Sequence, residues 1–586
     1  MNRKNLTAAV LAGLAGVAGI AGTAQAVNIN PDGTGQVLLY PYYTTNDGNQ
    51  TLISVVNTTD QAKAVKVRFL EGFNSREVLD FNLYMSREDV WTAVLADSSA
   101  FGAEAGVPHL YTTDSSCTVP YLYNQASTAP GLQAFLNFAY SGDMNDGGPE
   151  SIARAAEGHF EMIEMGTLVD DGEYDFATWV THEDGMLDLD DCLKLTEAWT
   201  EVVNDLDESG IWVQEAKAND GCDDPAGTDD GPDRACDQAY TGTERNSGGL
   251  FGGAAIVNAD NGTMYSYDAK AIQGFDRSDF GLHFRPGTIY PSLESGDELT
   301  AYVFFGVPQN QAVPVTYSDY SVDAVSAVFM HDYVMNEYVV EDDLNAGTEW
   351  VLTFPTKNFY VDPDRMELAG IEWPTPCLEW EEDEDADSGY SCAEEDNLAR
   401  QPFTELFGAE DDGQPLCEVV SIQTWDREEQ TFQPDDPNVP ILPPVVSPSV
   451  PPEFGCDDFG NCPTFFQLCN EVNVLRFGDQ VIFGTPEIEG DSLLVTVEDE
   501  FSAGWGRIDF TYNTRIDQMR TDEEGLVGLP VTGFAAYEFE NDFAEGGDVK
   551  AYYGGLFGHK ASVRATTAAD WGDDIVEKPE PPAPTN

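Results

Sequence analysis

Residues Ala64–Phe69 read Ala-Val-Lys-Val-Arg-Phe, and residues Val78–Tyr84 read Val-Leu-Asp-Phe-Asn-Leu-Tyr. In both stretches apolar side chains alternate with polar ones, which is the period of a β-strand that buries one face and exposes the other to water. Turn-forming runs at residues 46–48 and 57–60 separate these stretches from similar neighbours. The pattern predicts consecutive antiparallel strands of an immunoglobulin-like β-sandwich between residues 36 and 95.

The rest of the chain predicts a mainly β protein with some α-helix. Apolar residues near helical spacing predict an amphipathic helix over 191–206, and residues 321–333 also have a helical pattern. Asn261-Gly262 predicts a hairpin within residues 255–272, and residues 349–362 predict a strand interrupted at Pro355. Further strands are predicted at 472–483, 493–498, 506–512, 533–539 and 550–553.

Changes in composition along the chain suggest six segments. We predict a signal peptide, a β-sandwich domain, a mixed α+β central region with acidic disulfide loops, a Pro-rich linker or loop, a β-rich C-terminal region and a disordered tail. In the same order, these segments cover residues 1–26, 27–119, 120–430, 431–453, 454–572 and 573–586.

The first 26 residues have the pattern of a bacterial secretory signal peptide. A short basic stretch with Arg3 and Lys4 precedes an apolar run, and Ala24-Gln25-Ala26 forms the A-x-A pattern of a cleavage site. The apolar run is shorter than the ~20 residues that span a bilayer, and no later segment approaches that length. We expect cleavage after Ala26 and a location outside the cytoplasm of a Gram-negative bacterium: periplasm, cell surface or medium.

The chain is strongly acidic, with 105 acidic and 27 basic residues and a formal net charge of −78. Nucleic acid as a partner is excluded because it needs clustered Lys and Arg, and anionic lipid is excluded by the same charge. Self-repulsion of this size favours a salty medium, where screening is strong, or bound cations. The charge is consistent with two interpretations: acidic loops that are solvated by water, and acidic loops that bind calcium.

The cysteines predict disulfides. An even number of cysteines in an exported chain is typical of cross-links rather than metal ligands. We predict the pairs Cys222–Cys236 and Cys377–Cys392, because each encloses a short acidic loop, and closing such a loop contributes ~3 kcal/mol. The ten cysteines are Cys117, Cys192, Cys222, Cys236, Cys377, Cys392, Cys417, Cys456, Cys462 and Cys469.

Two acidic loops are candidate calcium sites. In the first, aspartates at positions 1, 3 and 5 and a glutamate at position 12 match the ligand spacing of an EF-hand loop. Gly389 stands at position 7 instead of 6, and Pro374 and Pro376 do not permit an ordinary incoming helix, so a looser oxygen cage is predicted. The candidate ligands are Asp383, Asp385, Asp387 and Glu394 in the first loop, and Asp223, Asp229 and Asp233 in the second.

Known catalytic motifs do not fit this sequence. Gly490-Asp491-Ser492-Leu493 spells a hydrolase motif, but the downstream His559 does not follow an Asp by three residues, so no base is oriented for Ser492. The six histidines form no zinc-binding pair. The glycine-rich run 248–253 leads into a strand, whereas a phosphate loop follows a strand and opens a helix. No catalytic residue and no certain cofactor is predicted.

Aromatic strand segments resemble a group of uncharacterised exported, cell-surface proteins of Gram-negative bacteria. The resemblance rests on residues 35–43, 52–57, 78–93 and 348–362, and it implies a location but no activity. Together with the charge and the cysteines, it favours a non-enzymatic structural or adhesive protein, secreted or on the cell surface, that binds calcium weakly. The alternative is a carbohydrate-binding or glycan-active exported protein, so the expected partners are cations, glycans or other surface proteins.

Overall fold

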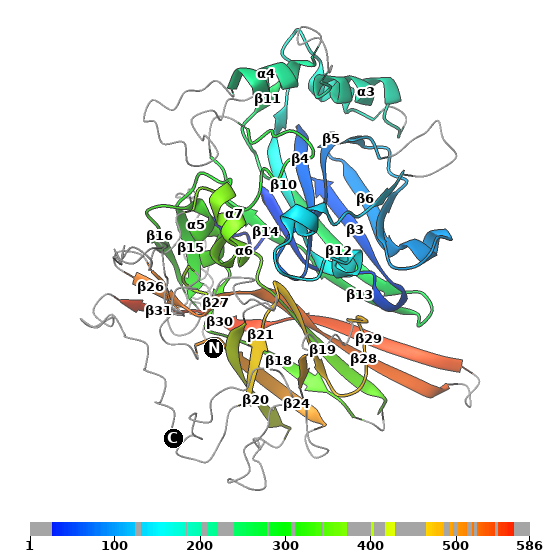
Figure 1. Ribbon diagram of the computed structural model, residues 1–586, viewed down its shortest axis with the longest axis vertical. Coiled ribbons are helices and arrows are strands. Elements are labelled where there is room, and N and C mark those ends of the chain that lie inside the picture. Colours follow the sequence, from blue (N-terminus) through cyan, green and yellow to red (C-terminus); the bar gives the residue numbers. More distant parts are fainter. Residues whose placement is uncertain are drawn as a thin grey trace, which may run out of the picture.

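The computed structural model describes residues 26–567 apart from 123–130, 183–184, 202–208, 220–239, 278–280, 306–310, 342–343, 372–399, 404–416, 428–463, 486–492, 496–501, 512–517, 521–523 and 545–548. It confirms the predicted mainly β class. Figure 1 shows two stacked groups of strands, one built from the N-terminal half of the chain and one from the C-terminal half, with short helices at the periphery.

The N-terminal group consists of two facing sheets. The first sheet has the order β1-β14-β2-β10-β4-β5-β8, with β11 paired to β10, and the second has the order β13-β12-β3-β6-β7-β9. Their strands are β1 Asn28–Ile29, β2 Val37–Thr44, β3 Asn49–Asn57, β4 Ala62–Glu71, β5 Glu77–Met85, β6 Val90–Asp97, β7 Pro108–Thr112, β8 Cys117–Val119, β9 Gly131–Ala134, β10 Glu157–Leu168, β11 Thr243–Glu244, β12 Leu250–Asn258, β13 Thr263–Asp268 and β14 Lys270–Gln273.

The five strands β2 to β6 lie where strands were predicted between residues 36 and 95. Many of their partners come from far along the chain. Strand β2 pairs with β10 and β14, and β3 pairs with β12 and β6. Only β4 and β5 form a hairpin among these five. The two sheets therefore include strands up to residue 273, beyond the predicted range 27–119, and their order does not confirm an immunoglobulin-like sandwich.

The C-terminal group has two five-stranded sheets, ordered β21-β20-β24-β18-β30 and β23-β22-β19-β28-β29. Three small sheets, β15-β16, β17-β27 and β25-β26-β31, lie beside them. The bounds are β15 Thr300–Phe305, β16 Gln311–Thr316, β17 Met330–His331, β18 Tyr333–Val339, β19 Ala346–Thr353, β20 Glu418–Asp426, β21 Thr464–Leu468, β22 Val472–Phe477, β23 Leu493–Val495, β24 Ala503–Asp509, β25 Gln518–Arg520, β26 Glu524–Val527, β27 Leu529–Pro530, β28 Thr532–Ala544, β29 Val549–Gly558, β30 Lys560–Ser562 and β31 Arg564–Thr567.

The two groups share a packed core. Every residue of β2 and of β19 is buried, because each strand has its own sandwich on one face and the other group on the opposite face. In β19, Trp350 packs in the core of the C-terminal group, while Val351 packs with the N-terminal strands. The Thr353 hydroxyl also donates to the Pro41 carbonyl at 2.6 Å. The described chain is one continuous body.

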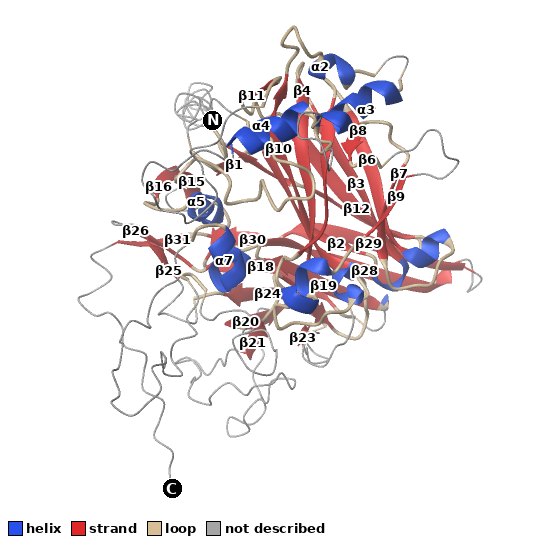
Figure 2. Cartoon of the chain, turned by 45° about the horizontal axis from the view of Figure 1, so that its top comes forward, coloured by secondary structure: helices blue, strands red, loops and turns tan. Residues whose placement is uncertain are grey.

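The helices are short and lie at the periphery (Figure 2). The predicted amphipathic helix begins at Leu189 and ends at Ala198, and Asp188 caps it by accepting the Asp190 N–H at 2.9 Å. The helix predicted over 321–333 is only Ser321–Ala327, because the chain then enters β17. Among the described residues, no helix is long and apolar enough to cross a membrane. The helices are α2 Phe176–Trp179, α3 Leu189–Ala198, α4 Ile211–Asn219, α5 Ser321–Ala327, α6 Asn358–Val361 and α7 Pro363–Leu368.

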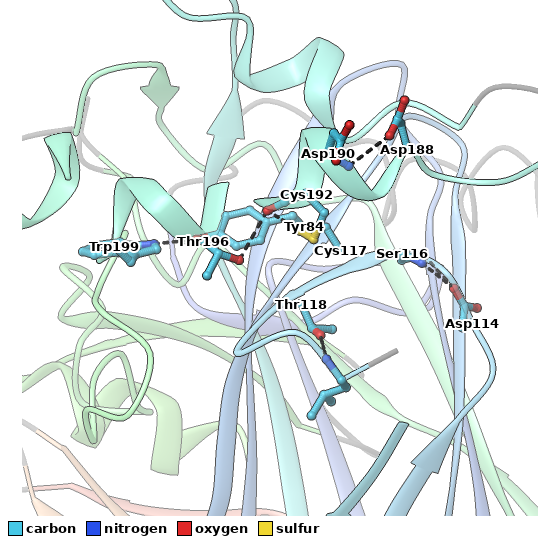
Figure 3. The surroundings of a disulfide bond; sticks show 11 residues. Tyr84, Asp114, Ser116, Cys117, Thr118, Asp188, Asp190, Cys192, Thr196 and Trp199 are labelled. Atoms are coloured by element: carbon cyan, nitrogen blue, oxygen red, sulfur yellow. Dashed lines mark hydrogen bonds between the residues drawn. A yellow bond between two sulfur atoms is a disulfide. The ribbon is translucent and has the colours of Figure 1, made fainter. Parts of the chain in front are cut away.

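Two disulfides lie within the described residues, Cys117–Cys192 and Cys417–Cys469. The first joins β8 to α3, as Figure 3 shows, and both cysteines are fully buried in a cluster with Trp199. The predicted pairs Cys222–Cys236 and Cys377–Cys392 lie outside the described residues.

The charged face of β4 is buried, so the prediction that it meets water is wrong. Lys63 donates to Glu164 on β10 at 2.6 Å, and Lys66 pairs with Asp80 on β5 and donates to the Thr288 carbonyl at 2.8 Å. Arg68, also on β4, pairs with Glu77 and Glu161. Residues 282–294 cover this face, where the Thr288 and Phe284 carbonyls accept hydrogen bonds from β4 and β5. This cover removes the charged side chains from water, and the salt bridges compensate their charges.

A buried carboxylate lies where the two groups meet. Glu349 on β19 is 1 % exposed, and its Oε2 accepts the Phe483 N–H at 2.8 Å. Burial raises the pKa of Glu349 to about 7, although the two backbone N–H groups that it faces act in the opposite direction. The folded protein therefore holds a proton on Glu349 at pH values where the unfolded chain has lost it.

We expect Glu349→Gln to stabilise the protein above pH 7. The wild type loses stability as the pH rises from about 4.5 to about 7, the interval between the ordinary and the folded pKa. The loss approaches about 3 kcal/mol at 1.36 kcal/mol per unit of pKa. Glutamine carries no charge and removes this dependence. Urea unfolding of the wild type and the variant at pH 5 and pH 8.5 measures this pH dependence of the free energy of unfolding. An equal pH dependence in the two proteins contradicts a raised pKa of Glu349.

Candidate functional site

The predicted calcium ligands cannot be located in the fold. Asp383, Asp385, Asp387 and Glu394 lie outside the described residues, and so do Asp223, Asp229 and Asp233. Within the part of the chain that the structure describes, no group of three or more His, Cys, Asp or Glu side chains is arranged to hold a metal ion. The calcium loops therefore stay a prediction.

The outward side of the six-stranded sheet carries a depression and several exposed side chains. Side chains alternate in these strands, so that Ile53, Trp91 and Ile256 point into the core and their neighbours point outward. One row of outward residues runs across five adjacent strands in register. We call this side the outer face; the row consists of Ser266, Ala255, Leu52, Val94 and Tyr111.

The outer face carries little charge. The strands β3, β6, β7, β9, β12 and β13 contain two acidic residues, Asp97 and Asp268, and no Lys or Arg. The whole chain has 105 acidic residues among 586, so the sheet is strongly depleted of them. Several of its exposed side chains are apolar, with 38 % exposure for Leu52 and 60 % for Met264. Exposed apolar patches of this kind are typical of interaction surfaces.

A depression of about 520 Å³ lies on the outer face. Small residues form its floor, since Gly253 and Ala255 on β12 lie beside Ser54 and Leu52 on β3. Hydroxyl-bearing residues also line it, including Ser54, Thr92 and the exposed Ser266. The volume and the open shape suit a flat or extended ligand.

Aromatic side chains form one rim of the depression. Tyr111 on β7 lines it, and the Phe101 ring stacks on Tyr111 with centroids 5.6 Å apart. Phe101 also contacts the ring of His109 at 6.0 Å and is itself 37 % exposed. The rim thus offers a partly exposed aromatic surface beside hydroxyl groups.

A second, polar pocket of about 580 Å³ adjoins the depression, because Thr113 lines both. Asp89 and Asp114 lie in it, together with Ser86 and His182. The Ser116 hydroxyl donates to Asp114 Oδ1 at 2.8 Å, and Asp114 Oδ2 accepts the N–H of Thr92 on β6 at 3.1 Å. The two cavities thus lie side by side, and carboxylates are more frequent in the second, which Glu88, Asp89 and Asp114 line, than in the first, which Asp268 lines.

The Ser, His and Asp of this pocket do not form a catalytic triad. His182 Nδ1 is 3.3 Å from the Ser86 hydroxyl and 3.8 Å from Asp89 Oδ2, so both neighbours lie at the same ring nitrogen. A triad needs the serine and the aspartate at opposite nitrogens of the imidazole. Burial raises the pKa of Asp89, and the nearby His182 acts in the opposite direction. This geometry supports hydrogen bonding to a ligand rather than activation of a nucleophile.

Other sequence candidates have structural roles. The glycine-rich run leads into β12, as predicted, and the Gly248 N–H donates to the buried Glu164 Oε2 at 2.7 Å. His559 is half-buried, and its Nε2 lies 3.0 Å from the Val351 carbonyl oxygen, so its ring bonds to the backbone of β19. Ser492 lies outside the described residues.

Sequence patterns alone did not reveal the outer face. Its central row combines β3 with β12, about two hundred residues later in the chain, and these strands align only in the folded sheet. The one available signal is the near absence of charge in residues 49–57 and 250–258 of so acidic a chain. No protein family, no curated protein and no solved structure matches the chain.

Proposed function

We propose that this is a non-enzymatic protein of the cell surface or periplasm that adheres to its partner through the outer face. The observation that carries the proposal is the weakly charged, partly apolar sheet surface around the 520 Å³ depression in a chain of net charge −78. Water solvates the acidic surface well, whereas exposed apolar side chains gain free energy on being covered.

The predicted export of the chain supports this role. The two disulfides suit an oxidising compartment, and the signal-peptide pattern supplies the route to it. N-terminal sequencing and fractionation of the source cells test the location; material recovered in the cytoplasm with an intact leader contradicts it.

Leu52→Lys is expected to weaken adhesion at least tenfold without a large effect on folding. Leu52 lies in the centre of the outward row and is 38 % exposed, so lysine adds a charge where the partner docks while the core is untouched. Leu193→Lys on α3 is the matched control, because Leu193 is 41 % exposed and lies away from the outer face. Binding of labelled protein to whole cells and to immobilised surface components measures the effect.

Equal loss in the two lysine variants would show that added charge, and not the outer face, affects adhesion. Unchanged adhesion in both variants would remove the outer face as the binding surface. Circular dichroism and melting of each variant confirm that the proteins remain folded.

Carbohydrate binding is the second candidate function, and the aromatic rim favours it. The apolar side of a sugar ring packs on an exposed aromatic ring, and its hydroxyls bond to carboxylates and hydroxyls such as those around Tyr111 and Asp114. A glycan array with the Tyr111→Ala variant as comparison tests it, and a reducing-sugar assay tests for glycan cleavage. If the protein is a purely structural one, we expect neither glycan binding on the array nor glycan cleavage in the assay.

Weak calcium binding by the acidic loops is a separate part of the proposal. Calorimetric titration with Ca²⁺ tests it, with the variant Asp383→Asn/Asp385→Asn as comparison. Absence of heat and of any rise in melting temperature contradicts calcium binding and leaves the adhesive role untouched.

A further inference from the structure

The predicted cleavage site lies inside the folded protein. Ala26, the last residue of the A-x-A pattern, is 2 % exposed, and Val27 is fully buried in the apolar core. The Ala26 carbonyl oxygen accepts the Asn28 side-chain amide at 2.9 Å. It also lies so close to Gly274 that a Cβ there would come within 2.4 Å of it. The peptide bond between Ala26 and Val27 is therefore closely surrounded by protein.

Val27 is held as an additional strand residue. Its N–H donates to the Thr300 carbonyl at 2.8 Å, and its own carbonyl accepts the Tyr302 N–H at 2.8 Å. These bonds form a parallel bridge to Ala301 on β15. The next two residues pair with β14. Residues 27–29 thus connect the first sheet to the small β15-β16 sheet.

Glu298 lies at the same strand edge as the Val27 nitrogen. Its Oε1 accepts the Thr300 N–H at 2.9 Å, and in an extended strand the N–H and C=O of one residue point to the same side. The Thr300 carbonyl, on that side, receives the Val27 N–H. Glu298 is 5 % exposed and also pairs with Arg277, whose side chain is 38 % exposed. A buried carboxylate therefore faces the position of the new N-terminus.

We propose that signal-peptide removal creates a charged α-ammonium at Val27 that the folded protein holds inside, against the Thr300 carbonyl and the Glu298 carboxylate. Hydrolysis by signal peptidase adds one water, leaves a carboxylate on Ala26 of the released leader and gives Val27 an amine that takes up a proton. The ammonium shares Glu298 with Arg277, so the buried cation is compensated.

The burial also sets an order of events. A protease needs an extended, accessible peptide, and the bond between Ala26 and Val27 offers none once the core has closed. Cleavage thus comes before residues 27–29 dock, and their docking completes the contact between the first sheet and β15.

The first measurement is the reactivity of the α-amine in the natural exported protein. N-terminal sequencing is expected to read Val-Asn-Ile. An amine-reactive ester near neutral pH is expected to label Val27 about 100-fold more slowly in the folded protein than in urea, because labelling requires local opening. A different N-terminal residue, or labelling of the folded protein at the unfolded rate, overturns the proposal.

The second measurement tests Glu298. We expect Glu298→Gln to raise the labelling rate of the folded protein about tenfold, because loss of the carboxylate weakens the docked state of Val27 and makes local opening more frequent. Glu337→Gln, at an exposed carboxylate on β18, is the control and is expected to have no effect. Refolded chains that begin at Val27 or at Ala24 complete the design. Glu298→Gln is expected to lower the melting temperature more in the chain that begins at Val27, because only that chain has its α-ammonium beside Glu298. An equal decrease in both chains overturns the role of Glu298.

Discussion

Replacing Arg154 with methionine is expected to lower the free energy of unfolding by about 3–5 kcal/mol, because it leaves the buried Glu71 without its cation and leaves Asp146 with only Arg76, at 3.7 Å. Arg154 lies in the turn before β10 and is 6 % exposed. It donates from Nε and Nη2 to the two oxygens of Glu71 at 2.7 and 2.9 Å, and from Nη2 to Asp146 at 2.6 Å. Urea unfolding near pH 7 measures the loss.

The same arginine affects the ionisation of Asp146. Burial acts to raise the pKa of Asp146, but hydrogen bonds and charge from Arg154 hold it below its ordinary value. Stability from Asp146 is thus present above the ordinary pKa and is lost as the pH falls through the lower folded value. In Arg154→Met this acid-side loss is expected to become smaller, because only the Gly148 N–H and Arg76 then act to lower the pKa of Asp146.

Arg285→Met is the matched control. The Arg285 side chain is 47 % exposed and its nearest contact with Glu201 is 3.7 Å, so its removal is expected to cost less than about 1 kcal/mol. A similar small cost for Arg154→Met would show that the buried network contributes little to stability.

Removing the disulfide between Cys117 and Cys192 with a double serine variant is expected to cost about 4 kcal/mol. The two cysteines are 75 residues apart in sequence, so the cross-link strongly restricts the unfolded chain. In the folded state it ties α3 to the edge strand β8, beside Tyr84 and Trp199 (Figure 3). Thermal unfolding of the oxidised wild type and the variant measures the loss.

A double alanine variant at the same positions separates the cross-link from side-chain effects. Serine buries two hydroxyls and alanine leaves a small cavity, but both remove the same restriction on the unfolded chain. Similar losses in the two variants are expected. A wild-type melting temperature in either variant would contradict a stabilising role for this disulfide.

The accuracy of the sequence predictions depended on the range of the interactions involved. The hairpin around Asn261-Gly262 is confirmed, since β12 and β13 pair across residues 259–262 and only a short turn decides it. The strands predicted after residue 472 exist as β22, β23, β24, β28 and β29, but with other bounds: the strand predicted over 472–483 ends at Phe477, and the one predicted over 506–512 is Ala503–Asp509. The helix over 321–333 was too long, because β17 and β18 pair with strands about two hundred residues later.

The sequence by itself determined the β class, the excess of acidic charge, the export signal pattern and the existence of local elements such as α3, although the bounds of α3, Leu189–Ala198, differ from the predicted range 191–206. These properties follow from side-chain period, from composition and from capping residues, all of which act over a few positions. Which face of each strand meets water was decided only by the tertiary structure. Alternation in β4 and in β3 looks alike in sequence, yet residues 282–294 cover the charged face of β4, while the outer face of β3 stays open. Burial depends on what packs against a face, and that partner comes from distant parts of the chain.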